Sequence, residues 1–152
     1  MNEEQLNAAI QTEYFYLQKT IEDFDSRALT IKAWSVTFSL VAMLAAFSSN
    51  SYIPFILSLV SSAVFWLLEV EWKIFQLCYS SRSKLIEMYF RGEAEIKHPL
   101  QIGSSWHAEW ETVKMQRVKQ VMLWPHVALP HGLVMILGGL LFFLATIDVV
   151  SL

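Results

Sequence analysis

The stretch ALTIKAWSVTFSLVAMLAAFSSNSYIPFILSLVSSAVFWLLEVEWK, from Ala28 to Lys73, decides the fold class of this chain. It holds two apolar blocks separated only by Ser48 to Ser51, and no charged residue occurs from Ala33 to Leu68. A second uncharged segment covers residues 120–147. A soluble core does not need uncharged segments of this length. A bilayer does, because a charged side chain in hydrocarbon is costly.

The apolar blocks predict three membrane-spanning helices. A hydrocarbon core of ~30 Å requires about 20 apolar residues in a helix. Residues 33–49 and 52–68 are close to this length, and 127–147 reaches it with glycines that membrane helices tolerate. We therefore expect an all-α integral membrane protein with three transmembrane helices and long amphipathic cytoplasmic helices.

The basic residues predict the orientation in the membrane. All eleven Lys and Arg residues fall in residues 1–32 and 69–126. By the positive-inside rule these parts face the cytoplasm, and the carboxy terminus faces the periplasm of a bacterial inner membrane. The first apolar block starts too late for a signal peptide, so we expect it to remain in the mature protein. The predicted parts are a cytoplasmic amphipathic helix (1–32), a transmembrane hairpin (33–72), a cytoplasmic stalk with a returning helix (73–126) and a third transmembrane helix (127–152).

The cytoplasmic parts carry helical periodicity. Apolar residues recur at steps of three and four along the first helix, at Leu6, Ile10, Tyr14, Leu17, Ile21, Phe24 and Ala28. Since neither Pro nor Gly occurs between Glu3 and Phe47, this helix should continue into the first span. The second span should likewise continue to Gly92, a helix stop. A further helix, capped by Ser104 or Ser105, should run past Val121, and Pro125 and Pro130 should break or kink the chain beyond it.

The apolar faces of the stalks predict self-association. One thin protomer cannot bury them all, so we expect a homo-oligomer, with a tetramer as the number of subunits. A monomeric three-helix cytoplasmic bundle is the alternative.

Sequence motifs of catalysis are missing. The chain has no glycine-rich phosphate loop, no His-Glu-x-x-His and no nucleophile elbow. His107 and Glu109 point about 160° apart on a helix, which is poor geometry for a metal. His126 and His131 are interpreted as interfacial residues, and Cys78 as a packed hydrophobe. We expect no enzyme activity, no cofactor and no metal.

A polar stripe on the second span has two interpretations. Ser58, Ser62, Phe65 and Glu69 fall within about 60° of one helix face. Small hydroxyl residues let membrane helices pack closely. The same stripe, ending in a carboxylate with one Phe constriction, could line a cation pore.

A set of basic residues could bind an anionic ligand on the cytoplasmic side. If the stalk packs beside the returning helix, these residues could form a phosphate-binding surface. Ordinary surface charge that serves the positive-inside rule is the competing interpretation. The set comprises Arg82, Lys84, Arg91, Lys97, Lys114, Arg117 and Lys119.

A resemblance bears on these alternatives. The segment YFYLQKTIEDFDSRALTIKAWSV, Tyr14 to Val36, runs from an amphipathic helix into a span. It resembles small membrane effectors of bacterial anti-phage defence, of the Hailong-type channel kind and, more loosely, SLATT-like and CRISPR-associated membrane effectors. The resemblance implies an oligomeric inner-membrane channel that is gated by a nucleotide or single-stranded oligonucleotide from a partner nucleotidyltransferase. Opening would depolarise the infected cell and abort the infection.

Three functions therefore remain open. The first is a ligand-gated pore, and the second is a non-conducting membrane anchor that recruits a cytoplasmic partner through its stalks. The third, an intramembrane enzyme, is disfavoured by the missing motifs.

Overall fold

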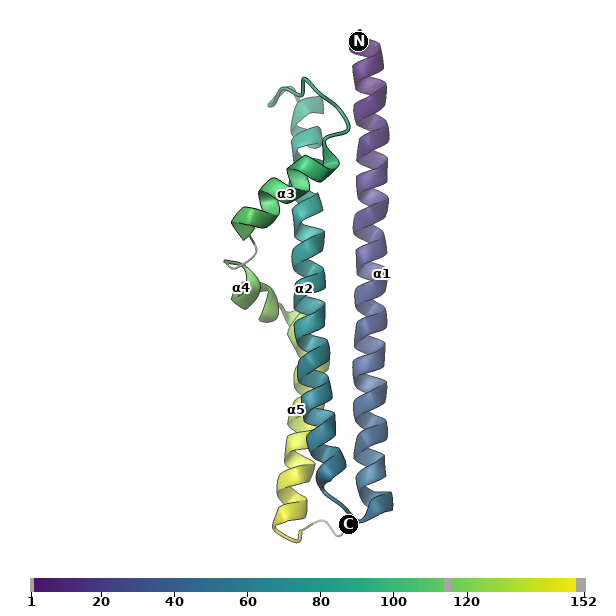
Figure 1. The fold of residues 1–152 in the computed structure, drawn as a ribbon, viewed down its shortest axis with the longest axis vertical. Helices are drawn as coiled ribbons and strands as arrows, with labels where there is room; N and C mark the ends of the chain where they lie inside the picture. The colour runs from purple at the N-terminus through teal and green to yellow at the C-terminus, as the bar shows by residue number, and fades with distance from the viewer. Residues whose placement is uncertain (1, 114–115, 150–152) are drawn as a thin grey trace. The chain divides into compact units, whose positions relative to one another are not determined.

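The computed structural model describes residues 2–113 and 116–149, and these residues form helices and connecting turns with no strand. The helices are α1 (Glu3–Ser49), α2 (Ile53–Phe90), α3 (Ile102–Val113), α4 (Val118–Met122) and α5 (Pro125–Thr146) (Figure 1). Three of them, α1, α2 and α5, are long and apolar enough to cross a membrane. The predicted all-α class is confirmed, and a membrane location is compatible with these helices.

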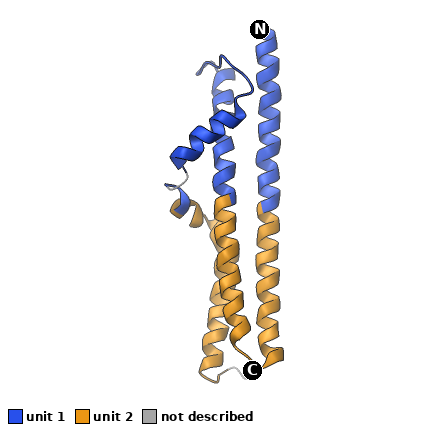
Figure 2. Cartoon of the chain, viewed as in Figure 1, with its two compact units in different colours: residues 1–27, 72–118 blue, residues 28–71, 119–152 orange. Residues whose placement is uncertain are grey.

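The described chain forms two compact units, coloured separately in Figure 2. Unit 1 comprises residues 1–27 and 72–118, and unit 2 comprises residues 28–71 and 119–152. The long helices α1 and α2 contribute to both, because no breaker interrupts either sequence. Each unit is described separately below.

The ends of the helices follow local sequence signals. Asn50, with a φ of 50°, starts the short connection between α1 and α2, and Asn is among the residues that tolerate this conformation. Gly92, with a φ of 75°, follows the end of α2, as predicted. Pro125 begins α5, where its missing N–H is not needed, and Pro130 lies inside the same helix.

The returning helix differs from the prediction. It begins at Ile102, so Ser104 lies in its first turn, where its hydroxyl donates to the Gln101 carbonyl at 3.2 Å. Neither predicted cap therefore starts the helix. The helix ends at Val113, and a turn at Gln116 and a bend at Arg117 precede the five residues of α4. The apolar periodicity continued across this interruption, which is why the sequence suggested one helix.

Unit 1 buries the apolar stripe of α1 within one protomer. Ile10 and Leu17 are fully buried against Ile86 of α2 and Ile96 of the loop that follows it. Phe24 packs against the ring of Trp72 at a centroid separation of 5.1 Å. Ile10 and Leu17 are therefore covered by α2 and its loop within the protomer, and self-association through the stalks remains a prediction.

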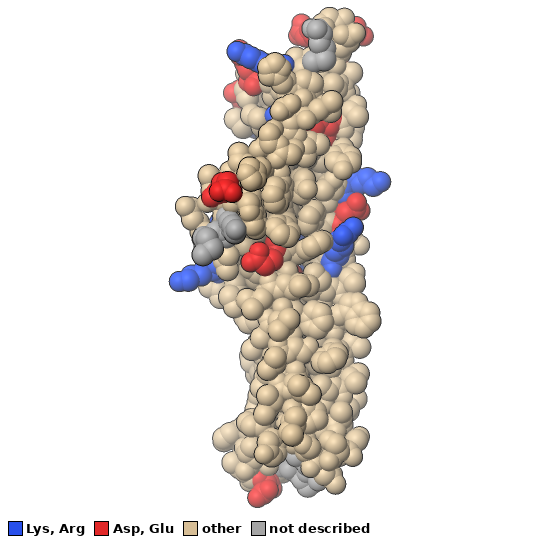
Figure 3. Space-filling view, in the orientation of Figure 1, with Lys and Arg blue, Asp and Glu red and all other residues tan. Residues whose placement is uncertain are grey.

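Unit 2 is apolar outside and partly polar inside. Its exposed side chains include Leu40, Val41, Leu44, Leu57, Val60, Val64, Leu133, Ile136, Leu140 and Phe143. Its fully buried side chains include Ser35, Ser39, Ser58, Ser62, Glu69 and His131. On the face seen in Figure 3, the lower half of the view is almost free of charged atoms. An apolar exterior over a polar interior suits a lipid environment.

Candidate functional site: a buried ionic network in unit 2

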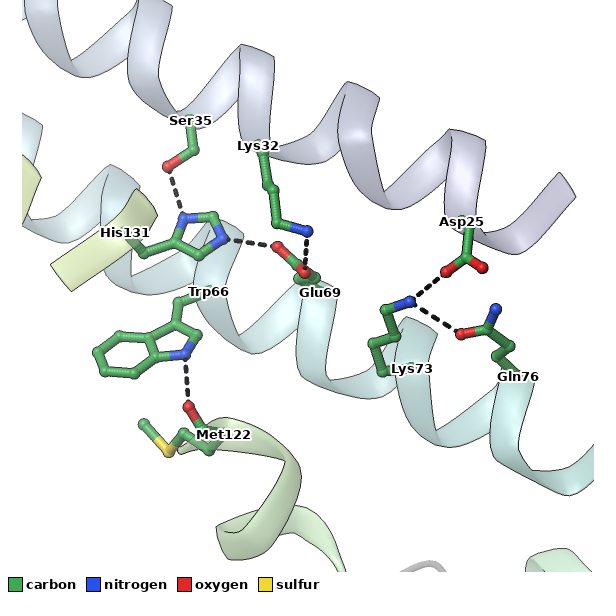
Figure 4. Close-up of polar contacts among 9 residues, drawn as sticks. All are labelled: Asp25, Lys32, Ser35, Trp66, Glu69, Lys73, Gln76, Met122 and His131. Atoms are coloured by element: carbon green, nitrogen blue, oxygen red, sulfur yellow. Dashed lines mark hydrogen bonds and ion pairs between the residues drawn. The ribbon is translucent and has the colours of Figure 1, made fainter. Parts of the chain in front are cut away.

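Four side chains from three helices of unit 2 form a connected polar network (Figure 4). Lys32 and Ser35 come from α1, Glu69 from α2 and His131 from α5. Glu69, Ser35 and His131 are fully buried, and the Lys32 side chain is 17% exposed. Charged residues of this kind are rarely buried unless they are paired.

Glu69 is the centre of the network. Its Oε1 lies 2.6 Å from the Lys32 ammonium, and its Oε2 lies 3.0 Å from Nε2 of His131. An unpaired carboxylate at this burial would be strongly unfavourable, so the two partners offset the loss of hydration. Oε1 is in ion-pair contact with Lys32 of α1 but accepts no hydrogen bond from the described residues, whereas Oε2 is within hydrogen-bond distance of His131 of α5.

His131 is held on both ring nitrogens. Its Nδ1 lies 2.8 Å from the Ser35 hydroxyl, while Nε2 faces Glu69. The Trp66 indole stacks nearly parallel on the imidazole, with 14° between the planes and 6.5 Å between the centroids. The ring therefore has a fixed orientation, and it connects a hydroxyl on one side to a carboxylate on the other.

Two hydrogen bonds from side chains of α2 to backbone carbonyls of α4 and α5 connect the helices around the network. The Ser62 hydroxyl donates to the His131 carbonyl at 3.1 Å. The Trp66 indole donates to the Met122 carbonyl at the end of α4, also at 3.1 Å. Pro130 has no N–H and therefore leaves the carbonyl of His126 without its helical donor, whereas the Ser62 hydroxyl bonds to the carbonyl of the next residue, His131, and connects α2 to α5 there.

The network lies near one end of the apolar helices. At 1.5 Å per residue, Lys32 lies about 26 Å from Ser49, and Glu69 about 24 Å from Ile53. His131 lies about 22 Å from Thr146 by the same measure. In a hydrocarbon core of ~30 Å, these side chains would lie inside its edge on the Lys32 side.

A row of serines continues from the network into the apolar part of unit 2. Beyond Ser62 come the buried Ser58 and Ser39, and the Ser39 hydroxyl lies 3.4 Å from the Ser58 carbonyl. The Ser58 hydroxyl has no hydrogen-bond partner among the described residues. A Cβ added to Gly138 would lie 3.2 Å from this hydroxyl, so the glycine leaves space for it. The row ends at an apolar cluster of Met43, Ala46, Phe55 and Val134.

This arrangement suits proton exchange better than covalent catalysis. Ser35 and Glu69 contact opposite nitrogens of one imidazole, and histidine can accept a proton at one nitrogen and release it at the other. Ser35 is fully buried inside α1, which closes it to attack on a substrate from solvent. Buried Glu and His residues in membrane helices commonly mark proton or ion pathways.

The predicted pore residues lie within unit 2. Ser58, Ser62 and Glu69 are fully buried against other helices of the same unit, and Phe65 is half-buried. The polar face of α2 therefore contacts α1 and α5. Lining of a pore by these residues remains a prediction, and any such path would run inside the protomer.

The predicted ligand-binding residues have different surroundings. Arg82 is buried and donates to Glu13 through Nε at 2.8 Å and Nη2 at 3.1 Å. Arg91 pairs with Glu93 at 3.1 Å. Arg91 is exposed, and so are Lys84, Lys97, Arg117 and Lys119, of which Lys119 belongs to unit 2 and the others to unit 1. Lys114 lies outside the described residues, and phosphate binding remains a prediction.

Three members of the network, Lys32, Ser35 and His131, were not among the predicted site residues. Lys32 served only as one of the basic residues that predict the orientation in the membrane, and His131 was interpreted as an interfacial residue. The sequence did contain signals for these two residues. Lys32 is a charged residue next to an apolar block, and His131 is a histidine inside an apolar block. Their partners lie 37 and 62 residues away along the chain, so spacing alone could not identify them.

Unit 1 contains its own polar contacts. The Lys73 ammonium contacts Asp25 and Gln76, and the Gln76 amide donates to the Ile21 carbonyl at 2.8 Å (Figure 4). Across the described residues, no group of three or more His, Cys, Asp or Glu side chains could hold a metal ion.

No protein-family model, curated protein or solved structure matches this chain.

Proposed function

We propose that this protein is a membrane channel that conducts protons or small cations along the polar row inside unit 2. The observation that supports the proposal is the fully buried pairing of Glu69 with His131 beside Lys32. The serines supply hydroxyl groups that can exchange hydrogen bonds, and the network supplies groups that can carry a proton. An intramembrane carboxylate also favours cations over anions.

The apolar cluster at the other end of the row would act as the gate. Met43 and Phe55 are buried there, and a constriction without polar groups excludes ions by excluding water. Conduction would require α1, α2 and α5 to separate at this cluster. The resemblance to defence effectors favours a closed resting state that opens on a signal, and nucleotide gating remains part of the proposal without an assigned ligand site.

Flux through the purified protein in liposomes tests the proposal. Glu69→Gln should lower proton or potassium flux about tenfold or more, since a change of 1.4 kcal/mol in a barrier is tenfold in rate. Glu71→Gln is the matched control, because Glu71 lies two residues away and is exposed. His131→Asn and His126→Asn form a second pair, the first residue buried and the second exposed. Equal flux for both members of each pair, or no flux under any condition, would exclude conduction through this row.

A second candidate is a non-conducting membrane anchor. One observation favours it: unit 1 has its own hydrophobic core and an open apolar groove near the start of α1. An absence of flux together with binding of a partner by unit 1 would support the anchor.

A further inference from the structure

The surface of unit 1 carries an apolar groove between the start of α1 and the end of α2. Its volume is about 1100 Å³. Ile86 is fully buried in it, whereas the rings of Phe15 and Phe90 are 63% and 54% exposed. Aromatic side chains this exposed, on two helices that border one groove, indicate a binding surface.

The charges around the groove are predominantly negative. The described lining residues include the carboxylates of Glu3, Glu4 and Glu87, and one guanidinium, that of Arg91. Arg91 is already paired with Glu93 at 3.1 Å, so its charge is partly offset. The surface offered to a partner is therefore apolar at its base and acidic at its edges.

Helix stability explains only some of these carboxylates. Glu3 and Glu4 lie in the first turn of α1, where negative charge favours the helix dipole. Glu87 lies in the last turn of α2, where negative charge is unfavourable for the helix. It accepts a hydrogen bond from the Tyr14 hydroxyl at 3.1 Å, and burial together with this carboxylate raises the pKa of Tyr14. Tyr14 thereby fixes one oxygen of Glu87 and leaves the other for a partner.

We propose that this groove binds a basic amphipathic helix of a partner protein, with apolar side chains against Phe15, Ile86 and Phe90 and Lys or Arg side chains against Glu3, Glu4 and Glu87. The α1 segment from Glu3 to Phe15 is about 18 Å long, which matches three turns of a helix. An amphipathic helix in an apolar groove is a common recognition mode. A second copy of this chain fits less well, because two acidic grooves facing each other would repel.

The proposal does not depend on conduction, and it is tested by binding. The probe is an 18-residue synthetic peptide of Leu and Lys at helical spacing, labelled with a fluorophore, against the full-length protein in nanodiscs of zwitterionic phosphatidylcholine. Empty nanodiscs provide the background, and a Leu and Glu peptide of equal length is the charge control. The Leu and Lys peptide should bind, the Leu and Glu peptide should not, and the affinity of the former should fall with added salt.

Two sets of variants locate the binding site. Phe15→Ser with Phe90→Ser should weaken binding about tenfold or more, as expected for aromatic residues at the centre of an interface. Tyr16→Ser is the control, because Tyr16 is 61% exposed but does not line the groove.

Glu3→Gln, Glu4→Gln and Glu87→Gln should each weaken binding about two- to fivefold. Glu22→Gln, Asp23→Asn and Glu95→Gln, all exposed and outside the groove, should have no effect.

Three outcomes would overturn the proposal. The first is equal binding of both peptides, and the second is unchanged binding after Phe15→Ser with Phe90→Ser in a protein whose helical circular dichroism is intact. The third is a purified oligomer that dissociates with the same two substitutions, which would make the groove an interface between copies of this chain. Flux measured on the same samples reports on unit 2 separately, so failure of one proposal is distinguishable from failure of the other.

Discussion

Nε2 of His131 lies 3.0 Å from Oε2 of Glu69, and both side chains are fully buried between the apolar helices of unit 2. The other carboxylate oxygen faces Lys32 at 2.6 Å, so one acidic group contacts side chains from α1 and α5. Because a buried carboxylate without its partners would be strongly unfavourable, Glu69 couples the positions of all three helices. A helix movement that separates any one of them must leave a charge unpaired or move it toward water.

A double-mutant cycle should reveal this coupling. Lys32→Met and Glu69→Gln should each lower the free energy of unfolding by about 3 kcal/mol, since each leaves a partner uncompensated. Lys32→Met combined with Glu69→Gln should cost less than the sum, because it removes both charges. Thermal unfolding in detergent measures the effect, and Glu71→Gln should change little. Strictly additive losses would mean that Lys32 and Glu69 do not stabilise each other.

The helices could be predicted from sequence because their signals are local. An uninterrupted run without Pro or Gly gives α1, and Gly92 marks the end of α2 through its backbone conformation. The polar stripe of Ser58, Ser62 and Glu69 was also visible from helical periodicity. The groups that contact this stripe could not be predicted, because the same polar face can border a pore, another helix or, as here, a histidine 62 residues away from Glu69.

For the stalk residues, too, the packing partner could not be predicted from the sequence. Ile10 and Leu17 form an apolar stripe that would look identical in an oligomer and in a monomer. Their cover comes from Ile86 of α2 and Ile96 of the following loop, and contributions from a loop leave no periodic signal. The face of a helix can therefore be predicted from spacing, but its partner depends on contacts between distant segments.

Packing at Gly138 should limit the size of the side chain there. A Cβ at this position would lie 3.0 Å from Cε of Met43 and 3.2 Å from the Ser58 hydroxyl. Gly138→Val should lower the free energy of unfolding by about 1–3 kcal/mol through overpacking. Gly132→Val is the control, because it makes the same replacement of a helical glycine by valine at a position where nothing lies within 4 Å of an added Cβ. Thermal unfolding of the two variants should differ, and equal stability would contradict the close approach at Gly138.

The topology prediction follows from the one-sided distribution of basic residues. Reporter fusions after Asn50 and after Leu152 should give a periplasmic signal, and a fusion at Gly92 a cytoplasmic one. A paired alkaline phosphatase and green fluorescent protein assay measures both outcomes. A cytoplasmic signal at Leu152 would mean that α5 does not cross the membrane.

Glu13 should hold the loop between α2 and α3 in place. Its carboxylate accepts from Arg82 and, at 2.8 Å, from the N–H of Leu100, which has an unfavourable φ of 63°. Glu13→Gln leaves the buried Arg82 guanidinium uncompensated and should cost about 3–5 kcal/mol. Cleavage by trypsin after Lys97 should accelerate, whereas Glu22→Gln at an exposed site should leave it unchanged. Equal cleavage rates would show that the loop does not depend on Glu13.

Cys78 should be a slow nucleophile in the folded protein. The thiol is fully buried, it lies 3.3 Å from the Ile74 carbonyl, and burial, followed by the Glu109 carboxylate, raises its pKa. Because only the thiolate reacts, a raised pKa lowers the reactive fraction at any pH below it. Iodoacetamide at pH 8 should therefore modify Cys78 slowly in the folded protein and much faster after denaturation, as measured by mass spectrometry. Lys84→Cys in a Cys78→Ala background places a thiol at an exposed position of α2 and should react quickly in both states. Rapid alkylation of Cys78 in the folded protein would contradict the burial of its thiol.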